Sequence, residues 1–154
     1  MTALKKKLTK LPTGWLFHHD MHLMVFRPRG IITKKRLDAA IKLLEQTEDE
    51  AAKPFNRFAD LSKLDAIDLE FRAMFQFSLH RRLFYEKRQS VRSAIYVTSP
   101  AAAHVAKIHA LLTNYSPLQV KLFDTMSKAA RWLDVSVETL TLDPWATEEP
   151  PSSG

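Results

Sequence analysis

The chain has no cysteine, which excludes a disulfide framework, a thiolate metal site and a cysteine nucleophile. Only 3 of its 154 residues are glycine, and the absence of both a G-x-G-x-x-G pattern and a Walker lysine loop argues against a glycine-rich phosphate loop. A G-x-S-x-G nucleophile elbow is missing too. No apolar run approaches the roughly 20 residues that cross a bilayer, and the basic residues 1–10 lead into no apolar signal segment. These absences favour a soluble, cytoplasmic protein and give little support to an enzyme.

Length and composition predict one globular domain. A chain of 154 residues is long enough to bury a substantial core. Apolar residues make up 45% of the chain and charged residues 26%, as in ordinary globular proteins. The formal net charge is +6 at pH 7, and the basic excess lies in residues 1–14 and 81–92. This charge favours anionic partners without naming one, although such runs most often form solvated surface.

Hydrophobic periodicity predicts an alternation of strands and helices. Residues 15–19 and 23–27 are rich in aromatic and β-branched side chains, and their short separation predicts an antiparallel pair. Apolar residues at positions 37, 40, 41 and 44 predict a helix capped by Thr33, followed by a surface connection over residues 46–53. The remaining predicted elements are strands at 55–59, 91–98 and 118–123, a helix over about 66–87, a helix that begins at Ser99-Pro100, and a final helix capped by Asp124.

After the opening hairpin the predicted order is α-β-α-β-α-β-α, which is typical of a mainly parallel sheet covered by helices. We therefore predict a single α/β domain at residues 14–142, with four to five strands, an antiparallel N-terminal hairpin and about four helices. Residues 1–13 are expected to form a flexible basic arm. Residues 143–154 are rich in Pro, Ser and Glu and are expected to form a disordered tail.

The predicted helix over residues 66–87 carries two apolar strips. The first recurs at i+4 steps and contains Ile67, Phe71, Phe75, Leu79 and Leu83, widened by Met74. The second contains Ala73, Phe77 and Phe84 and lies roughly 100° away around the helix. One strip is expected to face the sheet. The other then needs a neighbouring helix, a ligand or a second molecule.

The histidines and acids do not predict a catalytic or metal site. On a strand His18, Asp20 and His22 would share one face, and imidazole with carboxylate is a common ligand set. The predicted turn breaks that alternation, however, and favours polar turn residues. The other histidines, at positions 80, 104 and 109, are expected at the surface. The acids between residues 60 and 70 are expected to charge a helix N-terminus.

Two segments, taken with the element order, carry a resemblance to a known family. Residues 60–69 (Asp-Leu-Ser-Lys-Leu-Asp-Ala-Ile-Asp-Leu) and residues 120–133, which include Phe-Asp and Ala-Ala-Arg-Trp-Leu, resemble the STAS domain of anti-sigma-factor antagonists, the SpoIIAA-like group. Within that group the chain looks most similar to the STAS/SEC14-like variety. The likeness covers roughly residues 14–135. It implies a cytoplasmic, bacterial regulatory domain that works by binding, without a cofactor.

The chain departs from the family at its switch. In those antagonists a strand ending in Asp-Leu-Ser leads to an Asp-Ser-Ser-Gly stretch, in which a serine is phosphorylated. Asp68 matches the aspartate, but Leu69 occupies the phosphoacceptor position and Phe71 replaces one of the small residues after it. The resemblance therefore implies a module without the usual serine switch. Ser62 remains in the preceding loop as an alternative site, where phosphate would meet a helix N-terminus.

We expect a non-catalytic interaction module whose partner is another protein or a second copy. The predicted contact residues are Asp60, Ser62, Asp68, Leu69, Phe71, Phe77, Arg81 and Phe84. The alternative, implied by the SEC14 side of the resemblance, is a carrier or sensor of a small apolar ligand. Its mark would be a cavity on the order of several hundred Å³ beside Phe77. A weak anion or nucleic-acid binder comes third, and an enzyme with metal at His18, Asp20 and His22 comes last.

Overall fold

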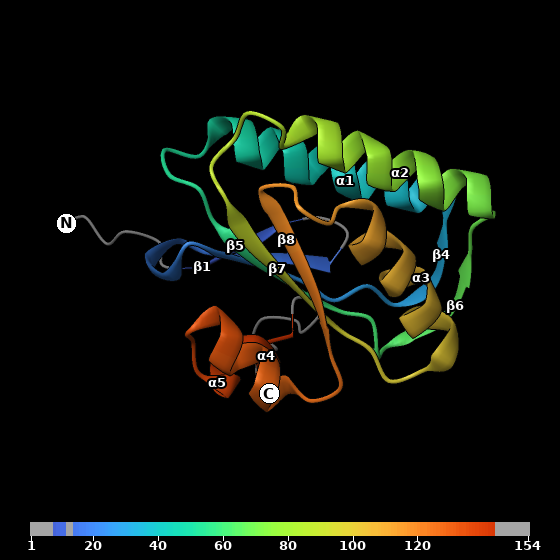
Figure 1. Cartoon of the computed structure of the whole chain (residues 1–154). Helices are drawn as coiled ribbons and strands as arrows, with labels where there is room; N and C mark the ends of the chain where they lie inside the picture. The colour runs from blue at the N-terminus through green and yellow to red at the C-terminus, as the bar shows by residue number, and fades with distance from the viewer. Residues whose placement is uncertain (1–7, 12–13, 144–154) are drawn as a thin grey trace, which may run out of the picture.

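The computed structural model describes residues 8–11 and 14–143, which form a mixed α/β fold (Figure 1). The elements in chain order are β1 (Leu8–Leu11), β2 (Trp15–His18), the 3-10 turn η2 (His19–Met21), β3 (Leu23–Phe26), β4 (Gly30–Thr33), α1 (Lys34–Glu50), β5 (Asn56–Asp60), β6 (Leu64–Asp68), α2 (Phe71–Phe84), β7 (Val91–Tyr96), α3 (Pro100–Leu112), β8 (Leu118–Phe123), α4 (Met126–Leu133) and α5 (Val137–Thr141).

The main sheet has the strand order β1-β2-β3-β5-β7-β8. Strands β1, β2 and β3 pair antiparallel, whereas β3, β5, β7 and β8 are parallel. In the hairpin Trp15 lies opposite Phe26, and their rings stack with centroids 4.3 Å apart. A mainly parallel sheet with an antiparallel N-terminal hairpin was the predicted fold class, and the structure confirms it.

Strand β1 differs from the sequence-based expectation. Leu8–Leu11 were expected within a flexible arm, yet they pair with β2 in a register that sets Leu8 opposite His18 and Leu11 opposite Trp15. Thr9 Oγ1 also lies 2.7 Å from His19 Nε2. The lysine-rich composition was a poor guide because an edge strand is held by backbone pairing and needs little apolar surface. The rest of the predicted arm, residues 1–7 and 12–13, lies outside the described residues.

A second, two-stranded parallel sheet of β4 and β6 was not predicted. The predicted helix start near Ala66 is wrong, because Leu64–Asp68 form strand β6 and Ile67 pairs with Ile32. Helix α2 begins at Phe71. The i+4 series of apolar residues ran across the boundary and concealed it. Helices α1 and α2 both begin at the β4–β6 end of the molecule (Figure 1).

Helix α1 is longer than predicted. It runs to Glu50, so the expected surface connection over residues 46–53 is mostly helical. Glu48 continues the apolar stripe one turn after Leu44 and is buried. The predicted caps Thr33 and Ser99 are confirmed, since each side chain accepts a hydrogen bond from a helix N–H. The cap of α4 is Thr125 rather than the predicted Asp124.

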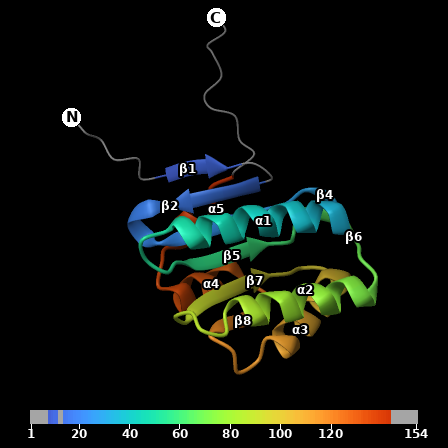
Figure 2. The same cartoon turned by 90° about the horizontal axis from the view of Figure 1, so that it is seen from above.

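The helices form two layers around the sheet. Helices α1, α2 and α3 lie on one face, and α4 with α5 lies on the other (Figures 1 and 2). The α4–α5 face has an apolar core that includes Leu16, Val25, Phe58, Leu133 and Leu140. The α1 side has a smaller core around Trp15, Met24 and Leu44. The cavity and the buried charged residues described below lie on the α1–α3 side.

Candidate functional site

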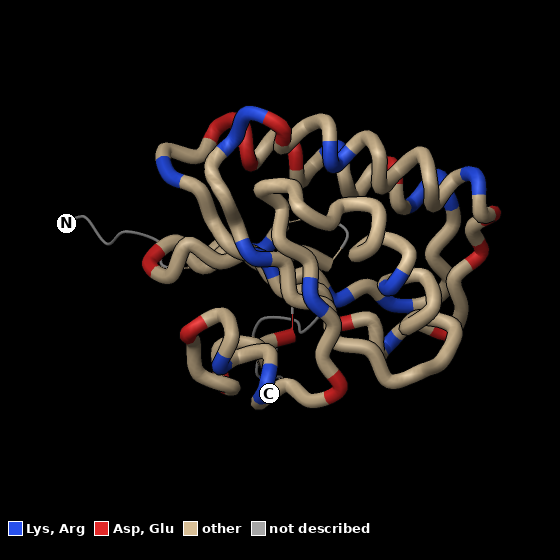
Figure 3. The backbone as a smooth tube through the Cα atoms, in the orientation of Figure 1, with Lys and Arg blue, Asp and Glu red and all other residues tan. Residues whose placement is uncertain are grey.

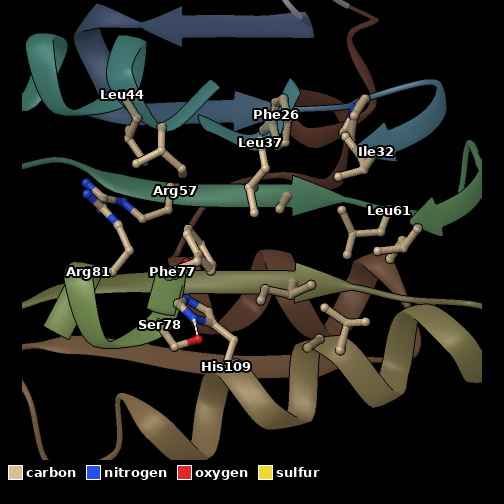
Figure 4. A pocket seen from close by; sticks show the side chains of 18 of the residues that line it. Phe26, Ile32, Leu37, Leu44, Arg57, Leu61, Phe77, Ser78, Arg81 and His109 are labelled. Atoms are coloured by element: carbon tan, nitrogen blue, oxygen red, sulfur yellow. Dashed lines mark hydrogen bonds between the residues drawn. The ribbon is translucent and has the colours of Figure 1, made fainter. Parts of the chain in front are cut away.

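An apolar cavity of about 140 Å³ lies between the sheet and helices α1, α2 and α3. Strands β5 and β7 form its floor, and the β4–β6 pair closes one end (Figure 4). Its apolar lining includes Leu37, Ile41, Met74, Phe77, Ile95 and Val105. A surface depression between α1 and α2 shares Leu37, Ile41 and Phe77 with the cavity. These three side chains therefore separate the depression from the cavity.

The other end of the cavity is ionic. Arg57 on β5 and Arg81 on α2 both line it, and both are buried. Glu48 on α1 lies between them: its Oε2 accepts from Arg57 Nη1 at 2.6 Å and from Arg81 Nη2 at 2.9 Å. The Tyr85 hydroxyl donates to the same oxygen. Acidic positions of α1 and basic positions at the end of α2 accordingly lie side by side in Figure 3.

Burial and pairing set the protonation states of this cluster. Burial alone would raise the pKa of Glu48, but the hydrogen bond from Arg81 and the charges of both arginines outweigh it and hold that pKa below its ordinary value. Burial, together with the neighbouring Glu48, raises the pKa of Tyr85 to about 12. At neutral pH Glu48 is therefore an anion, while Tyr85 is a neutral donor.

A serine and a histidine meet in the same wall. Ser78 Oγ lies 2.8 Å from His109 Nδ1, and the His109 ring stacks on Phe77 with centroids 4.8 Å apart. Burial, and secondarily the charge of Arg81, lowers the pKa of His109 to about 3. An imidazole this weakly basic is a poor general base, and Ser78 is buried within α2. The pair therefore favours a neutral polar contact over a nucleophile.

The predicted contact residues do not form one surface. Asp60 is buried, and its Oδ2 accepts from Arg27 Nε at 2.7 Å. Arg81 is buried as well, which contradicts the expectation of an exposed basic helix face. Asp68 and Phe71 are exposed, whereas Phe84 is half-buried. Leu69 and Phe77 line the cavity.

Ser62 and Asp60 form a local turn. Asp60 Oδ1 accepts hydrogen bonds from the Ser62 backbone N–H at 2.9 Å and from its hydroxyl at 2.6 Å. The Arg27 side chain, paired with Asp60, also donates to the carbonyls of Leu140 and Leu142. Strand β6 separates Ser62 from the start of α2 in the chain. Through Arg27, Asp60 thus links the end of β5 to the end of α5. The expectation that this aspartate charges a helix N-terminus is wrong.

The structure decides which of the two predicted apolar strips of α2 faces inward. The i+4 row is exposed; it contains Phe71, Phe75, Leu79 and Leu83. The inward side carries Met74, Phe77, Ser78 and Arg81 instead. The exposed row is therefore a free apolar stripe on the outside of the molecule, and the strip that contains Phe77 faces a cavity.

The basic segment at residues 81–92 is largely engaged by the protein itself. Arg82 donates to the carbonyl oxygens of Leu112 and Asn114, and Arg92 donates to the carbonyl of Trp132. Arg88 pairs with Asp49 and packs over the Phe84 ring, 3.9 Å from its centroid. These contacts give little support to a nucleic-acid surface at this segment.

The turn at residues 19–21 prevents the histidines and the aspartate of this segment from sharing one strand face. His18 ends β2, Asp20 lies in η2 and His22 has a left-handed backbone conformation. His18 is buried, which lowers its pKa despite the opposing charge of Asp20. Within residues 8–11 and 14–143, no group of three or more His, Cys, Asp or Glu side chains is arranged to hold a metal ion.

Sequence reasoning missed Glu48, Arg57, Ser78 and His109 as site residues. Two signals were available. Arg57 is a charged residue within the strand predicted at residues 55–59, between Phe55 and Phe58, and a charged residue that is buried needs a partner. Glu48 stands at the next position of the apolar stripe on α1. His109, expected at the surface, is instead packed against Phe77 because α3 lies beside α2.

No protein-family model matches the chain, and the search among curated proteins gives no significant match. A solved structure does match: an uncharacterized protein of the DUF3478 family with a SpoIIAA-like fold, from Shewanella loihica PV-4. The TM-score is 0.50 at 17% sequence identity, and the alignment covers 86% of this chain and 98% of that one. The fold is SpoIIAA-like. No helix among the described residues is long and apolar enough to span a membrane.

Proposed function

We propose that this SpoIIAA-like domain binds a small apolar ligand in the cavity between the sheet and helices α1 to α3. The observation that carries the proposal is the cavity itself, whose lining is mainly apolar and includes the buried Arg57 and Arg81 at one end. Left unfilled, 140 Å³ of apolar space costs about 3 kcal/mol of stability. That is a large share of the roughly 5–15 kcal/mol that stabilises a typical domain.

The cavity size restricts the ligand class. Drug-sized ligands typically occupy roughly 300–1,000 Å³, and the expected cavity of several hundred Å³ beside Phe77 is smaller in the structure, at about 140 Å³. An apolar cavity of about 150 Å³ accommodates benzene. The ligand, or the part of it that enters, therefore has an apolar body of about six carbons. Its role would be that of a sensor or carrier in a cytoplasmic, non-catalytic module.

The test uses 1-hexanol as a neutral probe. Titration followed by methyl NMR should give saturable shifts at Leu37, Ile41 and Val105, which line the cavity. Ala106→Met should abolish them, because Ala106 lines the cavity. The matched control is Ala102→Met, a buried position on the same helix away from the cavity, which should keep them. Absence of saturable shifts in the wild-type protein would overturn the proposal.

A second candidate function is protein interaction through α2. It is supported by the exposed apolar row of Phe71, Phe75, Leu79 and Leu83, since contiguous exposed apolar surface often marks an interface. Of the contact residues expected from the sequence, Phe71 fits this surface. A regulatory module without the family's serine switch at Leu69 is compatible with this candidate. Sedimentation analysis of the wild type beside Phe75→Ser would test self-association through the row.

A further inference from the structure

Large exposed apolar side chains gather on helix α2 and at the end of helix α3. Of the ten such side chains in the described part of the chain, six lie there: Phe71, Phe75, Leu79, Leu83, Leu111 and Tyr115. The two helices lie side by side (Figure 2), and Arg82 of α2 donates to the carbonyl oxygens of Leu112 and Asn114. These bonds hold the turn that carries Tyr115 beside the end of α2. We call the six residues the α2–α3 patch.

Tyr115 has a backbone conformation that its residue type disfavours. Its φ is 64°, in the left-handed region where a residue with a Cβ is strained. The residue is 94% exposed, so burial within the described structure does not offset the strain. The turn fixes this conformation: the Tyr115 N–H donates to Asn114 Oδ1, and Ser116 Oγ donates to the Thr113 carbonyl. Strained residues of this kind cluster at functional sites, which favours a binding role for the exposed ring.

The charged side chains of these two helices are all basic. Neither α2 nor α3 contains an Asp or a Glu. Arg72 and Lys107 are exposed and form no ion pair with any described residue, and Lys107 lies on the same face of α3 as Leu111, four positions later. The acids nearest to α2 in the sequence, Glu70 and Glu86, lie beyond its two ends. An apolar surface bordered by such cations complements a partner that combines an apolar face with carboxylates.

Charge and shape favour an acidic helix over two other occupants of the patch. A second copy docked through a two-fold axis would set the same basic face against itself, which is unfavourable. A flat bilayer suits a patch that protrudes most at its centre. In the row on α2, however, Phe75 and Leu79 in the middle are 38% and 37% exposed. The ends of the row are more prominent, with Phe71 at 60% and Leu83 at 67%, and such a shape suits a rounded helix.

We propose that the α2–α3 patch binds an acidic amphipathic helix of another protein. The apolar face of that helix lies on Phe75 and Leu79, its carboxylates lie toward Arg72 and Lys107, and Tyr115 contacts its end. Docking of an amphipathic helix through its apolar face is a common mode of recognition. This inference rests on the second candidate function, interaction through α2, and adds the chemistry of the partner.

The probe is a helical peptide of Ala, Leu and Glu with blocked ends, about five turns long, with leucines on one face and glutamates on the rest. One control peptide carries Lys in place of every Glu, and another has the same composition in an order that forms no apolar face. Fluorescence anisotropy at neutral pH should show that the acidic peptide binds at least about tenfold more tightly than either control. Equal affinity for the acidic and lysine peptides would overturn the proposal.

Two variants assign the binding to the patch. Phe75→Ser should lower the affinity for the acidic peptide at least about tenfold, whereas Leu142→Ser changes a comparably exposed residue after α5 and should bind like the wild type. Tyr115→Gly removes the ring and relieves the backbone strain. It should lower the affinity about threefold without lowering the temperature of unfolding. Wild-type affinity in both Phe75→Ser and Tyr115→Gly would overturn the site.

Charge reversal tests the partner's chemistry in a protein that keeps its apolar row. Arg72→Glu combined with Lys107→Glu should weaken binding of the acidic peptide about tenfold and make the lysine peptide the tighter ligand. The matched control combines Lys128→Glu with Arg131→Glu, which reverses two exposed cations on α4. It makes the same change in net charge and should keep the wild-type preference. An unchanged preference after reversal at residues 72 and 107 would contradict the proposed charge complementarity.

Two further measurements distinguish failure of the acidic helix from failure of the interaction function. Sedimentation should show a monomer, and a dimer that Phe75→Ser dissociates would mean that a second copy occupies the patch. Vesicles of phosphatidylcholine and phosphatidylserine should not bind the protein, and binding that Phe75→Ser abolishes would mean that a membrane occupies it. Either result overturns the acidic helix while α2 remains an interaction surface. If peptide, second copy and vesicles all fail to bind, the interaction function fails as well.

Discussion

The two faces of the central sheet are packed in different ways. On the α4–α5 face, Phe58, Ala129 and Leu140 pack into a continuous apolar core with no solvent exposure. On the α1–α3 face, a cavity remains, and the buried Arg57 and Arg81 that line it are paired with the buried Glu48. Close packing is the less costly way to bury a sheet face. The first face is therefore closely packed, whereas the second retains the space on which the ligand-binding proposal rests.

The largest expected effect on stability comes from removing the buried carboxylate of Glu48 on the α1–α3 face. Glu48→Gln leaves the two buried arginines without their shared anion, and loss of one partner from a buried ion pair costs about 3–5 kcal/mol. Urea denaturation measures the free energy of unfolding. Glu45→Gln is the matched control on the same helix, and because Glu45 is partly exposed, it should cost less than about 1 kcal/mol. Similar losses in both variants would contradict a buried network centred on Glu48.

The next effect is a dependence of stability on pH that originates on the same face. His109 has a folded-state pKa of about 3 against an ordinary value of 6.5, so the unfolded chain binds the extra proton first. Its contribution is complete above pH 6.5 and is lost as the pH falls toward 3. Between the ordinary pKa and about pH 5 the loss is about 2 kcal/mol.

Unfolding free energies measured over this range should show the slope in the wild type and a reduced slope in His109→Gln. His104→Gln, on the exposed side of the same helix, is the control and should keep the wild-type slope. His18, whose pKa burial also lowers, contributes a slope of the same sign in both variants. Identical pH profiles for the two variants would contradict the assignment to His109.

A smaller effect is expected from enlarging two alanines of helix α3, one beside the cavity and one in a filled region. Ala102 and Ala106 are both buried on α3, but only Ala106 lines the cavity. Ala102→Met should cost about 1–3 kcal/mol, because extra atoms in a filled region force strain. Ala106→Met should cost at least about 1 kcal/mol less, since cavity space receives the side chain. Thermal unfolding of both variants checks this, and equal costs would mean that the cavity is not available space.

The smallest effect on stability is expected on the solvent-exposed side of helix α2. Leu79→Gln changes the exposed apolar row of α2, and surface substitutions usually change stability by less than about 0.5 kcal/mol. Met74→Gln, on the buried side of the same helix, is the contrasting variant and should cost several times more. Denaturation midpoints measure both. A large loss in Leu79→Gln would show that the row is covered rather than exposed.

Much of the fold was predictable because it depends on local patterns. The paired strands around Trp15 and Phe26, the strand β7 and the caps Thr33 and Ser99 follow from period, propensity and turn chemistry. Boundaries were less predictable. The apolar series that begins at Ile67 crosses from a strand into a helix, and only the pairing of β6 with β4 shows where one ends and the other starts.

Most of the candidate site could not be predicted from the sequence. Leu69 and Phe77 were named in advance, and both line the cavity, but Arg81 was expected at the surface. Glu48, Arg57 and Arg81 are separated by 9 to 33 positions in their hydrogen-bonded pairs. No local pattern links residues at such separations. Likewise, the choice of inward strip on α2 depended on which neighbours α1 and α3 provided.

By itself, the sequence determined the class of fold and the elements that compose it, because side-chain period and helix capping act over a few neighbouring residues. Tertiary structure decided where the ionic groups meet, which strip of α2 faces inward and whether space remains beneath it. Those outcomes depend on how elements from distant parts of the chain pack together. The cavity between Phe77 and the sheet is a product of that packing alone.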